Sequence, residues 1–222
     1  MFSDTDYELA LDIARGLNLP EEFGSDYDSD TIMGVDLNDQ VAAMDIGYFF
    51  IETGATKAVI VPDDFNFVVK VSFTGFYQDD RFVPFEYAHA PDSTDYCWEE
   101  WITIHNANEE GFGAMFPETR FLGEFNGHRF YIQEKVKQNS RATSLATSQH
   151  SQDVAEDIYR EVYCFDRDFI ANIVENYGEN YWEEFYDWAN GYDDLLADMH
   201  GGNYGYTLSG KPIILDAATY RE

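Results

Sequence analysis

Three short apolar runs between residues 47 and 75 constrain the fold of this chain more than any other feature. The runs are separated by turn segments that contain glycine, proline and aspartate, and they comprise residues 48–51, 58–61 and 67–73. Short runs rich in β-branched and aromatic residues, bounded by such turns, are typical of strands. Because short turns join antiparallel neighbours, the sequence predicts an antiparallel meander here.

One charged residue interrupts the third of these runs. Lys70 stands between Val69 and Val71. A lysine buried in a strand costs free energy unless its ammonium group is paired. Lys70 therefore either has buried anionic partners or lies on an edge strand with its side chain in solvent, and both alternatives stay open at this point.

The segment 95–108 has the apolar spacing of an amphipathic helix and carries two adjacent carboxylates. Glu99 and Glu100 point about 100° apart on a helix, so only one of them can face inward. The neighbours Cys97 and Ile104 favour Glu100 as the inward residue, with Glu99 as the alternative. This helix therefore offers Lys70 a carboxylate partner.

The rest of the chain divides into segments with distinct patterns. We expect residues 1–46 to form an acidic cap that is helical in parts, with Asp4 able to cap its first helix, and residues 138–153 to form a hydroxyl-rich linker. Residues 76–95 receive no predicted element. Two further strands are expected at 116–123 and 128–136, and helices are expected within 154–176 and at 181–190.

Three polar residues near the end of the chain have a spacing that suggests metal chemistry. Asp198 is followed by Asn203, and a predicted hairpin separates Asn203 from Asp216. Because a hairpin folds back on itself, Asp216 is expected beside Asn203. An amide oxygen and a carboxylate suit Mg²⁺ bound together with phosphate oxygens. Asp198 could then orient or deprotonate an attacking hydroxyl; the alternative is a polar loop with a helix cap and a turn residue.

The string Asp198-Met-His-Gly-Gly-Asn203, followed by the hairpin and Asp216, resembles the catalytic loop and metal-binding aspartate of protein kinases and kinase-like phosphotransferases. It is similar to the prokaryotic branch that includes aminoglycoside phosphotransferases, and especially to the early serine/threonine protein kinases of autographiviruses. The resemblance implies an α+β, bilobal fold with a five-stranded antiparallel small lobe over residues 47–137 and a minimal, truncated helical large lobe over 138–222.

The resemblance also implies roles for individual residues, with ATP and Mg²⁺ as cofactors. Lys70 would hold ATP phosphates and pair with Glu100, Asn203 and Asp216 would bind Mg²⁺, and Asp198 would position the acceptor hydroxyl. His200 stands where many kinases keep a lysine that contacts the γ-phosphate. The remaining nucleotide contacts implied are Gly54 and Val59 of the glycine-rich loop, and the backbone at Glu134 and Val136 of the hinge.

Two departures from the kinase pattern are visible. Of the glycine-rich loop only Gly54 and the valine Val59 remain, while Glu52 and Lys57 occupy glycine positions. Glu52 places negative charge where phosphates should lie, and Lys57 could offset it. The chain also stops shortly after Asp216, so we expect a large lobe without the usual substrate-docking helices.

Composition restricts the partners and the compartment. The chain has 13 basic and 43 acidic residues, which gives a formal net charge of −30. Such a surface repels nucleic acids and anionic lipid, and it favours partners with basic surfaces. Two cysteines and the lack of a signal peptide or a long apolar run predict a protein of a reducing cytoplasm, the host cytoplasm if the chain is viral.

These observations lead to three candidate functions. The first is a serine/threonine protein kinase that transfers the γ-phosphoryl group of ATP to host proteins, with the chain itself as a further substrate. The second is a pseudokinase or acidic inhibitor, similar to a DNA mimic, that binds a host enzyme such as RNA polymerase. The third is a small-molecule phosphotransferase of the aminoglycoside type.

Overall fold

The computed structural model describes the chain except for residues 1, 28, 30, 55, 86–94, 139–146, 161–165, 192–194, 196–202, 208 and 218–222. The chain divides into two compact units. Unit 1 comprises Met1–Trp101 and Glu118–Lys135, and unit 2 comprises Ile102–Pro117 and Val136–Glu222. The described residues combine helices with several sheets, so the predicted α+β class is confirmed.

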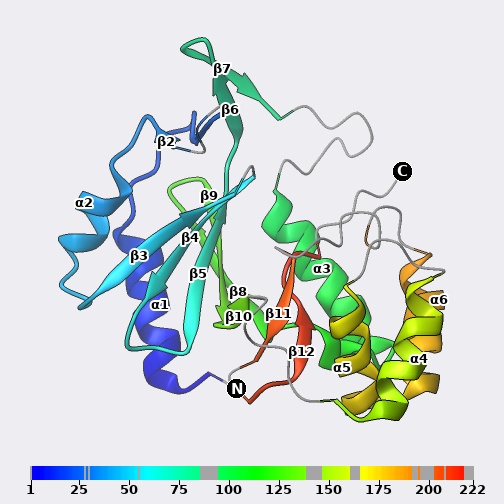
Figure 1. Cartoon of the computed structure of the whole chain (residues 1–222). Coiled ribbons are helices and arrows are strands. Elements are labelled where there is room, and N and C mark those ends of the chain that lie inside the picture. The colour runs from blue at the N-terminus through cyan, green and yellow to red at the C-terminus, as the bar shows by residue number, and fades with distance from the viewer. Residues whose placement is uncertain are drawn as a thin grey trace. The chain divides into compact units, whose positions relative to one another are not determined.

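A five-stranded antiparallel sheet forms the centre of unit 1 (Figure 1). Its strand order is β3-β4-β5-β9-β8, with β5 in the middle. The strands are β3 (Phe49–Thr53), β4 (Lys57–Pro62), β5 (Phe67–Ser72), β8 (Thr119–Phe125) and β9 (His128–Glu134). The predicted meander and the five-stranded sheet are therefore confirmed. β8 begins later than expected, because Pro117 cannot donate to a ladder and Phe116 is buried in the core of unit 2.

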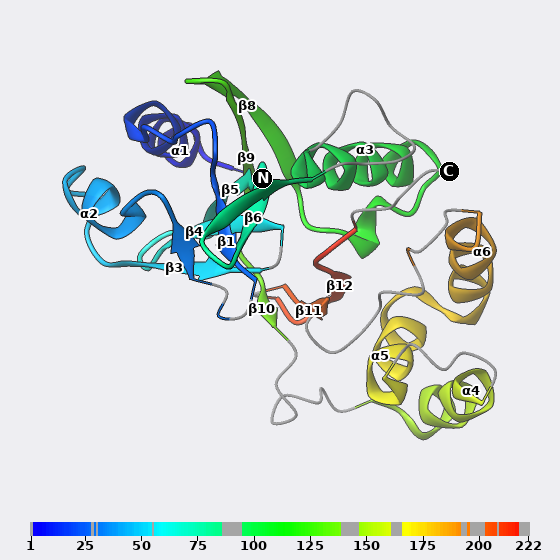
Figure 2. The same cartoon turned by 90° about the horizontal axis from the view of Figure 1, so that it is seen from above.

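Two N-terminal helices, α1 (Asp4–Gly16) and α2 (Leu37–Ala42), belong to unit 1. α1 lies along one face of the five-stranded sheet (Figure 2) and contacts β5, β8 and β9. Its buried residues Ala10, Ile13 and Ala14 recur at helical spacing, as a helix packed on a sheet requires. The predicted Asp4 cap is wrong: Ser3 caps the helix, because Ser3 and Asp6 form a reciprocal capping box.

A second sheet combines two strands from the region without a predicted element with two strands inside residues 1–46, so the predicted helical cap is not helical throughout. Its strand order is β2-β1-β6-β7, with a parallel pairing between β1 and β6. The strands are β1 (Gly24–Asp26), β2 (Ile32–Met33), β6 (Gly75–Gln78) and β7 (Arg81–Pro84). Asp79 and Asp80 both have positive φ and form the two-residue turn between β6 and β7.

The middle helix of the chain, α3 (Tyr96–Glu109), agrees with the predicted helix at 95–108. Residues of α3 up to Trp101 belong to unit 1, and those from Ile102 belong to unit 2. Its last part, including Ile104 and Ala107, lies in the hydrophobic core of unit 2.

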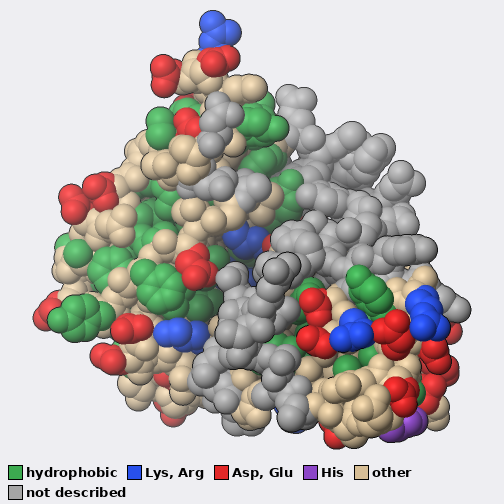
Figure 3. Space-filling view, viewed as in Figure 1, with side chains coloured by type: hydrophobic (Ala, Val, Ile, Leu, Met, Phe, Trp, Pro, Cys, Tyr) green, Lys and Arg blue, Asp and Glu red, His purple; other side chains and the backbone are tan. Residues whose placement is uncertain are grey.

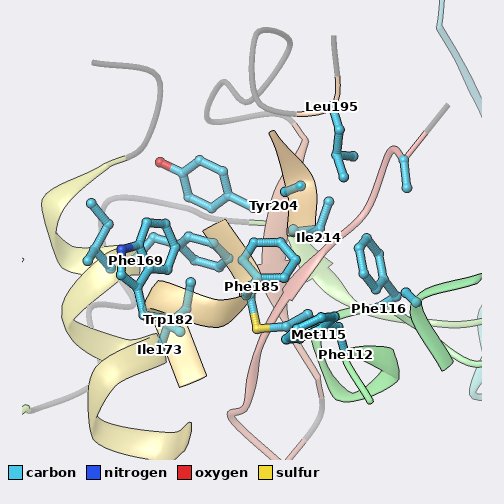
Figure 4. Close-up of a cluster of buried hydrophobic side chains, with 14 of the residues drawn as sticks. Phe112, Met115, Phe116, Phe169, Ile173, Trp182, Phe185, Leu195, Tyr204 and Ile214 are labelled. Atoms are coloured by element: carbon cyan, nitrogen blue, oxygen red, sulfur yellow. The ribbon is translucent and has the colours of Figure 1, made fainter. Parts of the chain in front are cut away.

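Unit 2 combines helices with a small sheet around an aromatic core. Figure 4 shows side chains of that core, in which Phe169 lies against Tyr204 with a ring-centroid distance of 4.3 Å. The sheet order is β10-β11-β12. The elements are η1 (Gly113–Met115), β10 (Lys137–Gln138), α4 (Gln149–Tyr159), α5 (Arg167–Tyr177), α6 (Glu179–Ala189), β11 (Tyr204–Tyr206) and β12 (Pro212–Ile214).

The predicted linker at 138–153 is wrong in its last part, because α4 begins at Gln149. Ser148 caps α4 by accepting a hydrogen bond from the backbone N–H of Ser151. Both hydroxyls donate to Glu175 Oε2 of α5, each at 2.6 Å. These hydroxyl groups therefore join two helices, which composition alone did not indicate.

The face shown in Figure 3 carries many acidic side chains and few basic ones, as the net charge of −30 requires. Across the described residues, no helix has the length and apolar character that a membrane span would need.

Candidate functional site

Strand register places Lys70 and Lys57 on the face of the five-stranded sheet opposite to the one that α1 contacts. Alternate residues of a strand point to opposite faces. In β4 and β5 the residues Ala58, Ile60, Val69 and Val71 lie in the core with α1, so their neighbours face the other way. On that second face Lys70 is paired with Val59 of β4 and Tyr131 of β9, while Lys57 is paired with Ser72 of β5.

Both lysines converge on a single carboxylate from α3. Lys70 Nζ lies 2.8 Å from Glu100 Oε1 and 3.0 Å from Oε2, and Lys57 Nζ lies 3.1 Å from Oε2. Gln133 Nε2 of β9 donates to Oε1 at 2.7 Å and also to Thr119 Oγ1 of β8 at 2.9 Å. Residues from strands β4, β5, β8 and β9 therefore participate in holding one side chain of α3. We call Lys57, Lys70, Glu100 and Gln133 the lysine–glutamate cluster.

The lysine–glutamate cluster is almost completely buried. The side chains of Lys57 and Lys70 are each 8% exposed, and that of Glu100 is 2% exposed. Removing charges from water costs several kcal/mol per ion in practice, and only close pairing with good hydrogen bonds offsets this. The predicted partner of Lys70 is thus Glu100 rather than Glu99, and the alternative of a solvent-facing lysine is wrong.

A polar network at the start of α3 fixes the position of this helix on the sheet. Asp95 accepts hydrogen bonds from Ser72 Oγ at 2.6 Å, from Tyr131 Oη at 3.0 Å and from the backbone N–H of Trp98 at 3.0 Å. Ser72 Oγ in turn accepts from the backbone N–H of Cys97 at 2.8 Å. β5 and β9 thus hold the first turn of α3, and Glu100 follows in the next turn.

Burial raises the pKa of two groups of this network. It raises the pKa of Tyr131, and the charge and hydrogen bond of Asp95 add to the effect. Burial likewise raises the pKa of the Cys97 thiol to about 12, although Lys57 opposes the shift. A thiol with such a pKa is not a thiolate at neutral pH, so Cys97 acts as a packing residue and not as a nucleophile.

The predicted loop residues surround the turn between β3 and β4. Gly54 lies in this turn, and its N–H donates to Lys57 O at 3.1 Å. Val59 is half-buried beside Lys70, and the exposed Glu52 is paired with Val59 from β3. Glu52 therefore lies on the same sheet face as the two lysines. A Cβ at Gly54 would contact no atom within 4 Å, so the fold of the described residues does not require glycine there.

The two predicted hinge residues lie at the end of β9 and just after it. Glu134 ends this strand, and its N–H donates to Glu118 O at 2.8 Å. The N–H of Lys135 donates to Asn66 O at 2.9 Å. Any ligand edge at Glu134 would therefore meet its carbonyl group, because the N–H is already bonded. Val136 is half-buried and belongs to unit 2.

The hairpin β11–β12 of unit 2 brings two predicted metal ligands to one end. Tyr204 pairs with Ile214, and the N–H of Leu215 donates to Asn203 O at 2.8 Å. Asn203 directly precedes β11 and is buried, while Asp216 follows β12 and is half-buried. The predicted return of Asp216 toward Asn203 therefore occurs.

An amide oxygen and a carboxylate at one hairpin end fit Mg²⁺, which commonly takes few protein ligands and completes its octahedron with phosphate oxygens and water. Among the described residues no group of three or more His, Cys, Asp or Glu side chains could hold a metal ion. Beside Asn203 and Asp216, such a cation would take phosphate oxygens and water as further ligands. The predicted Asp198 and His200 lie outside the described residues.

Sequence reasoning predicted the pairing of Lys70 with Glu100, which the structure confirms, but it missed two members of the lysine–glutamate cluster. The signal for Lys57 was the short turn between β4 and β5, which fixes a register with Lys57 and Lys70 on one face. The signal for Gln133 was its place directly after the run Phe130-Tyr-Ile132 in a predicted strand. The sequence matches no protein-family model and no curated protein.

Proposed function

We propose that this chain is a MgATP-dependent protein kinase that phosphorylates serine or threonine hydroxyls. The observation that carries the proposal is the buried ion pair of Lys70 and Glu100 on the sheet face that also carries Val59. A buried lysine held by a helix carboxylate is the arrangement that kinases use to grip nucleotide phosphates. Supporting it is the order of the remaining residues along the chain, which resembles that of kinases.

In this proposal each predicted site residue has its own role. Lys70, fixed by Glu100, binds phosphate oxygens, and Asn203 with Asp216 binds Mg²⁺. Gly54 and Val59 of unit 1, with the backbone of Glu134 and Val136, hold the nucleotide, and His200 serves the γ-phosphate or braces its loop. Asp198 orients the acceptor hydroxyl and takes its proton. Bound MgATP supplies the phosphoryl group, so the protein contributes positioning and charge stabilisation.

Thermal denaturation with and without MgATP tests the nucleotide site. Ligand at a hundred times its dissociation constant should add about 2.7 kcal/mol to the free energy of unfolding. We expect this gain in the wild type and in two surface controls, Lys211→Met and Asp157→Ala. It should be lost in Lys70→Met and in Asp216→Ala. A wild-type protein whose midpoint does not move at millimolar MgATP would contradict the proposal.

Phosphoryl transfer is tested separately, with labelled ATP and protein from host lysate. Asp198→Ala should lower the rate by ~10²–10⁴-fold without changing the MgATP midpoint shift, because the residue acts on the acceptor. Unchanged turnover in this variant would remove Asp198 from the mechanism. Transfer to aminoglycosides but to no protein would indicate the small-molecule phosphotransferase instead.

A second candidate is a non-catalytic binding protein, and the position of Glu52 favours it. This exposed carboxylate lies on the sheet face of the two lysines, where it repels phosphate. With a net charge of −30, such a protein would bind a basic surface of a host enzyme, with host RNA polymerase as one candidate. Binding to the host target that is competed by polyanions, without any nucleotide effect, would establish this function.

A further inference from the structure

A polar cavity lies in unit 1 where two neighbouring strands of the five-stranded sheet separate. β5 and β9 pair as far as Val71 and Phe130. Beyond this pair the chain that follows β5 turns away, because the N–H of Thr74 donates to Phe23 O and its carbonyl oxygen accepts from the N–H of Phe85. The cavity between the separated segments has a volume of about 210 Å³.

Residues from both separated segments, from β8 and from the position before α3 line the cavity. They are residues 72–74, Asp95, Glu124 and residues 127–129. None of them belongs to the lysine–glutamate cluster or to the predicted nucleotide contacts. Two carboxylates and one guanidinium group, that of Arg129, therefore meet at a place that no role described above uses.

The side chain of Arg129 is held by stacking and not by hydrogen bonds. Its guanidinium carbon lies 4.9 Å from the ring centroid of Trp98. Nε lies 3.8 Å from Glu124 Oε2, and Nη1 lies 3.9 Å from Asp95 Oδ2. Both distances exceed the roughly 2.7–3.2 Å of an N–H···O hydrogen bond. Within the described part of the chain, the side chains of Arg129 and Glu124 make no hydrogen bond, so the polar groups of both are available to a ligand.

The charges around the cavity disfavour a simple anion and a simple cation. The guanidinium fork suits a carboxylate, but Asp95 and Glu124 repel a ligand that carries negative charge alone. A ligand that carries positive charge alone is repelled by Arg129. A ligand with one group of each sign finds a partner for both. An α-amino acid carries its ammonium and carboxylate groups on the same carbon atom, which matches the short separation of Glu124 and Arg129.

We propose that this cavity binds a small free α-amino acid. Arg129 binds the carboxylate group and Glu124 binds the ammonium group. Asp95, which already accepts three hydrogen bonds, adds negative charge beside the ammonium group. A cavity of about 150 Å³ can hold benzene, so the volume here suits a ligand of roughly six to nine non-hydrogen atoms, such as alanine, serine or threonine. Because the cavity shares no residue with the proposed nucleotide site, binding does not depend on kinase activity.

An NMR titration of ¹⁵N-labelled protein with L-alanine, L-serine and L-threonine tests the proposal. At millimolar amino acid, the side-chain Nε–H signal of Arg129 and the backbone signals of residues 127–129 should shift and saturate. N-acetylalanine lacks the ammonium group and alaninamide lacks the carboxylate, so each should bind at least about tenfold more weakly than alanine. γ-Aminobutyrate carries both charges on a longer chain and should be weakened in the same way.

Variants at the two exposed partners measure the contribution of each charge. Arg129→Met should weaken alanine binding roughly tenfold or more, and Arg129→Lys should recover only part of the affinity, because it keeps the charge without the fork. Glu124→Gln should weaken binding about 3- to 10-fold, because this side chain is 60% exposed and water screens its charge. Arg160→Met and Glu109→Gln change exposed residues outside the cavity and should bind alanine like the wild type.

Several results would overturn the proposal. Signals of residues 127–129 that stay unshifted with all three amino acids would exclude a site at this cavity. Binding of N-acetylalanine or alaninamide as tight as that of alanine would show that one charge is enough. Equal shifts with glycerol would indicate a polar cavity that does not require charge. Wild-type affinity in both Arg129→Met and Glu124→Gln would place the bound amino acid elsewhere.

Discussion

Replacing Glu100 by glutamine should lower the free energy of unfolding far more than the same replacement at an exposed glutamate. The Glu100 side chain is 2% exposed, and its carboxylate accepts four hydrogen bonds, three of them from ammonium groups. Glutamine keeps the shape, but it removes the negative charge and turns an N–H₂ group toward a lysine. Breaking a buried ion pair by removing one partner typically costs about 3–5 kcal/mol, and the burial here leaves no reason to discount this for solvent screening.

The matched control is Glu109→Gln on the same helix. Glu109 contacts His105 at 3.4 Å, and both side chains are more than half exposed. An exposed pair of this kind contributes about 0.3–0.5 kcal/mol. Urea denaturation followed by tryptophan fluorescence gives the free energy of unfolding for both variants. The corresponding drop in thermal midpoint for Glu100→Gln is roughly 6–20 °C for a chain of this size.

The result that would refute this reasoning is a Glu100→Gln variant within about 1 kcal/mol of the wild type, since that is no more than an ordinary mutation costs. It would mean that the two lysines and Gln133 are satisfied without the carboxylate charge. The lysine–glutamate cluster would then not be what determines the position of α3 on the sheet.

Three further predictions concern other parts of the structure. Gly24→Ala should lower the free energy of unfolding by about 1–3 kcal/mol, because the added Cβ would overlap the carbonyl oxygen of Gly75. Gly54→Ala should change the free energy of unfolding by less than about 0.5 kcal/mol. Equal effects of the two variants in urea denaturation would contradict the backbone contact between β1 and β6. Burial lowers the pKa of His128 below 6.5, despite the hydrogen bond to Pro20 O. The neutral imidazole therefore contributes its full stability above pH 6.5, and this contribution is lost as the pH falls through the folded-state pKa. The difference between the stability–pH curves of wild type and His128→Gln measures the contribution, and parallel curves between pH 5 and 7 would exclude it. Raising the ionic strength to about 1 M, where the Debye length is about 3 Å, should raise the thermal midpoint because it screens repulsion within a chain of net charge −30; a midpoint that falls with NaCl would show that attractive pairs dominate.

Much of unit 1 could be predicted because its local patterns agree with its tertiary structure. Around Ile51, Ile60 and Val69 the apolar residues either alternate with polar ones or form short continuous runs, as in half-buried and fully buried strands, and the turns between them are short. The pairing of Lys70 with Glu100 also followed from local rules, since a buried lysine demands a partner and helical spacing turned Glu100 inward. In each case one physical requirement left few alternatives.

The features that were missed depend on contacts between segments far apart in the chain. β1 pairs with β6 because Gly24 and Gly75 let the two backbones approach closely. Neither glycine alone predicts this strand pairing from the sequence. The start of α4 depends on Glu175, which accepts from hydroxyls of Ser148 and Ser151. The place of Lys57 in the cluster depended on strand register, which a period-2 pattern fixes only after the turn is known. The roles assigned to Asn203 and Asp216 stay predictions.

The strand order of the five-stranded sheet has a consequence for how the chain is made. The middle strand β5 ends at Ser72, but its neighbour β9 begins only at His128. A ribosome adds about 5–20 residues per second, so one edge of β5 stays without its partner for several seconds during synthesis. Every residue of β5 is buried in the finished sheet. Until β9 is made, the unpaired edge of this apolar strand can form hydrogen bonds with strands of other nascent chains. Translation speed between β5 and β9 should therefore decide how much of this protein escapes aggregation.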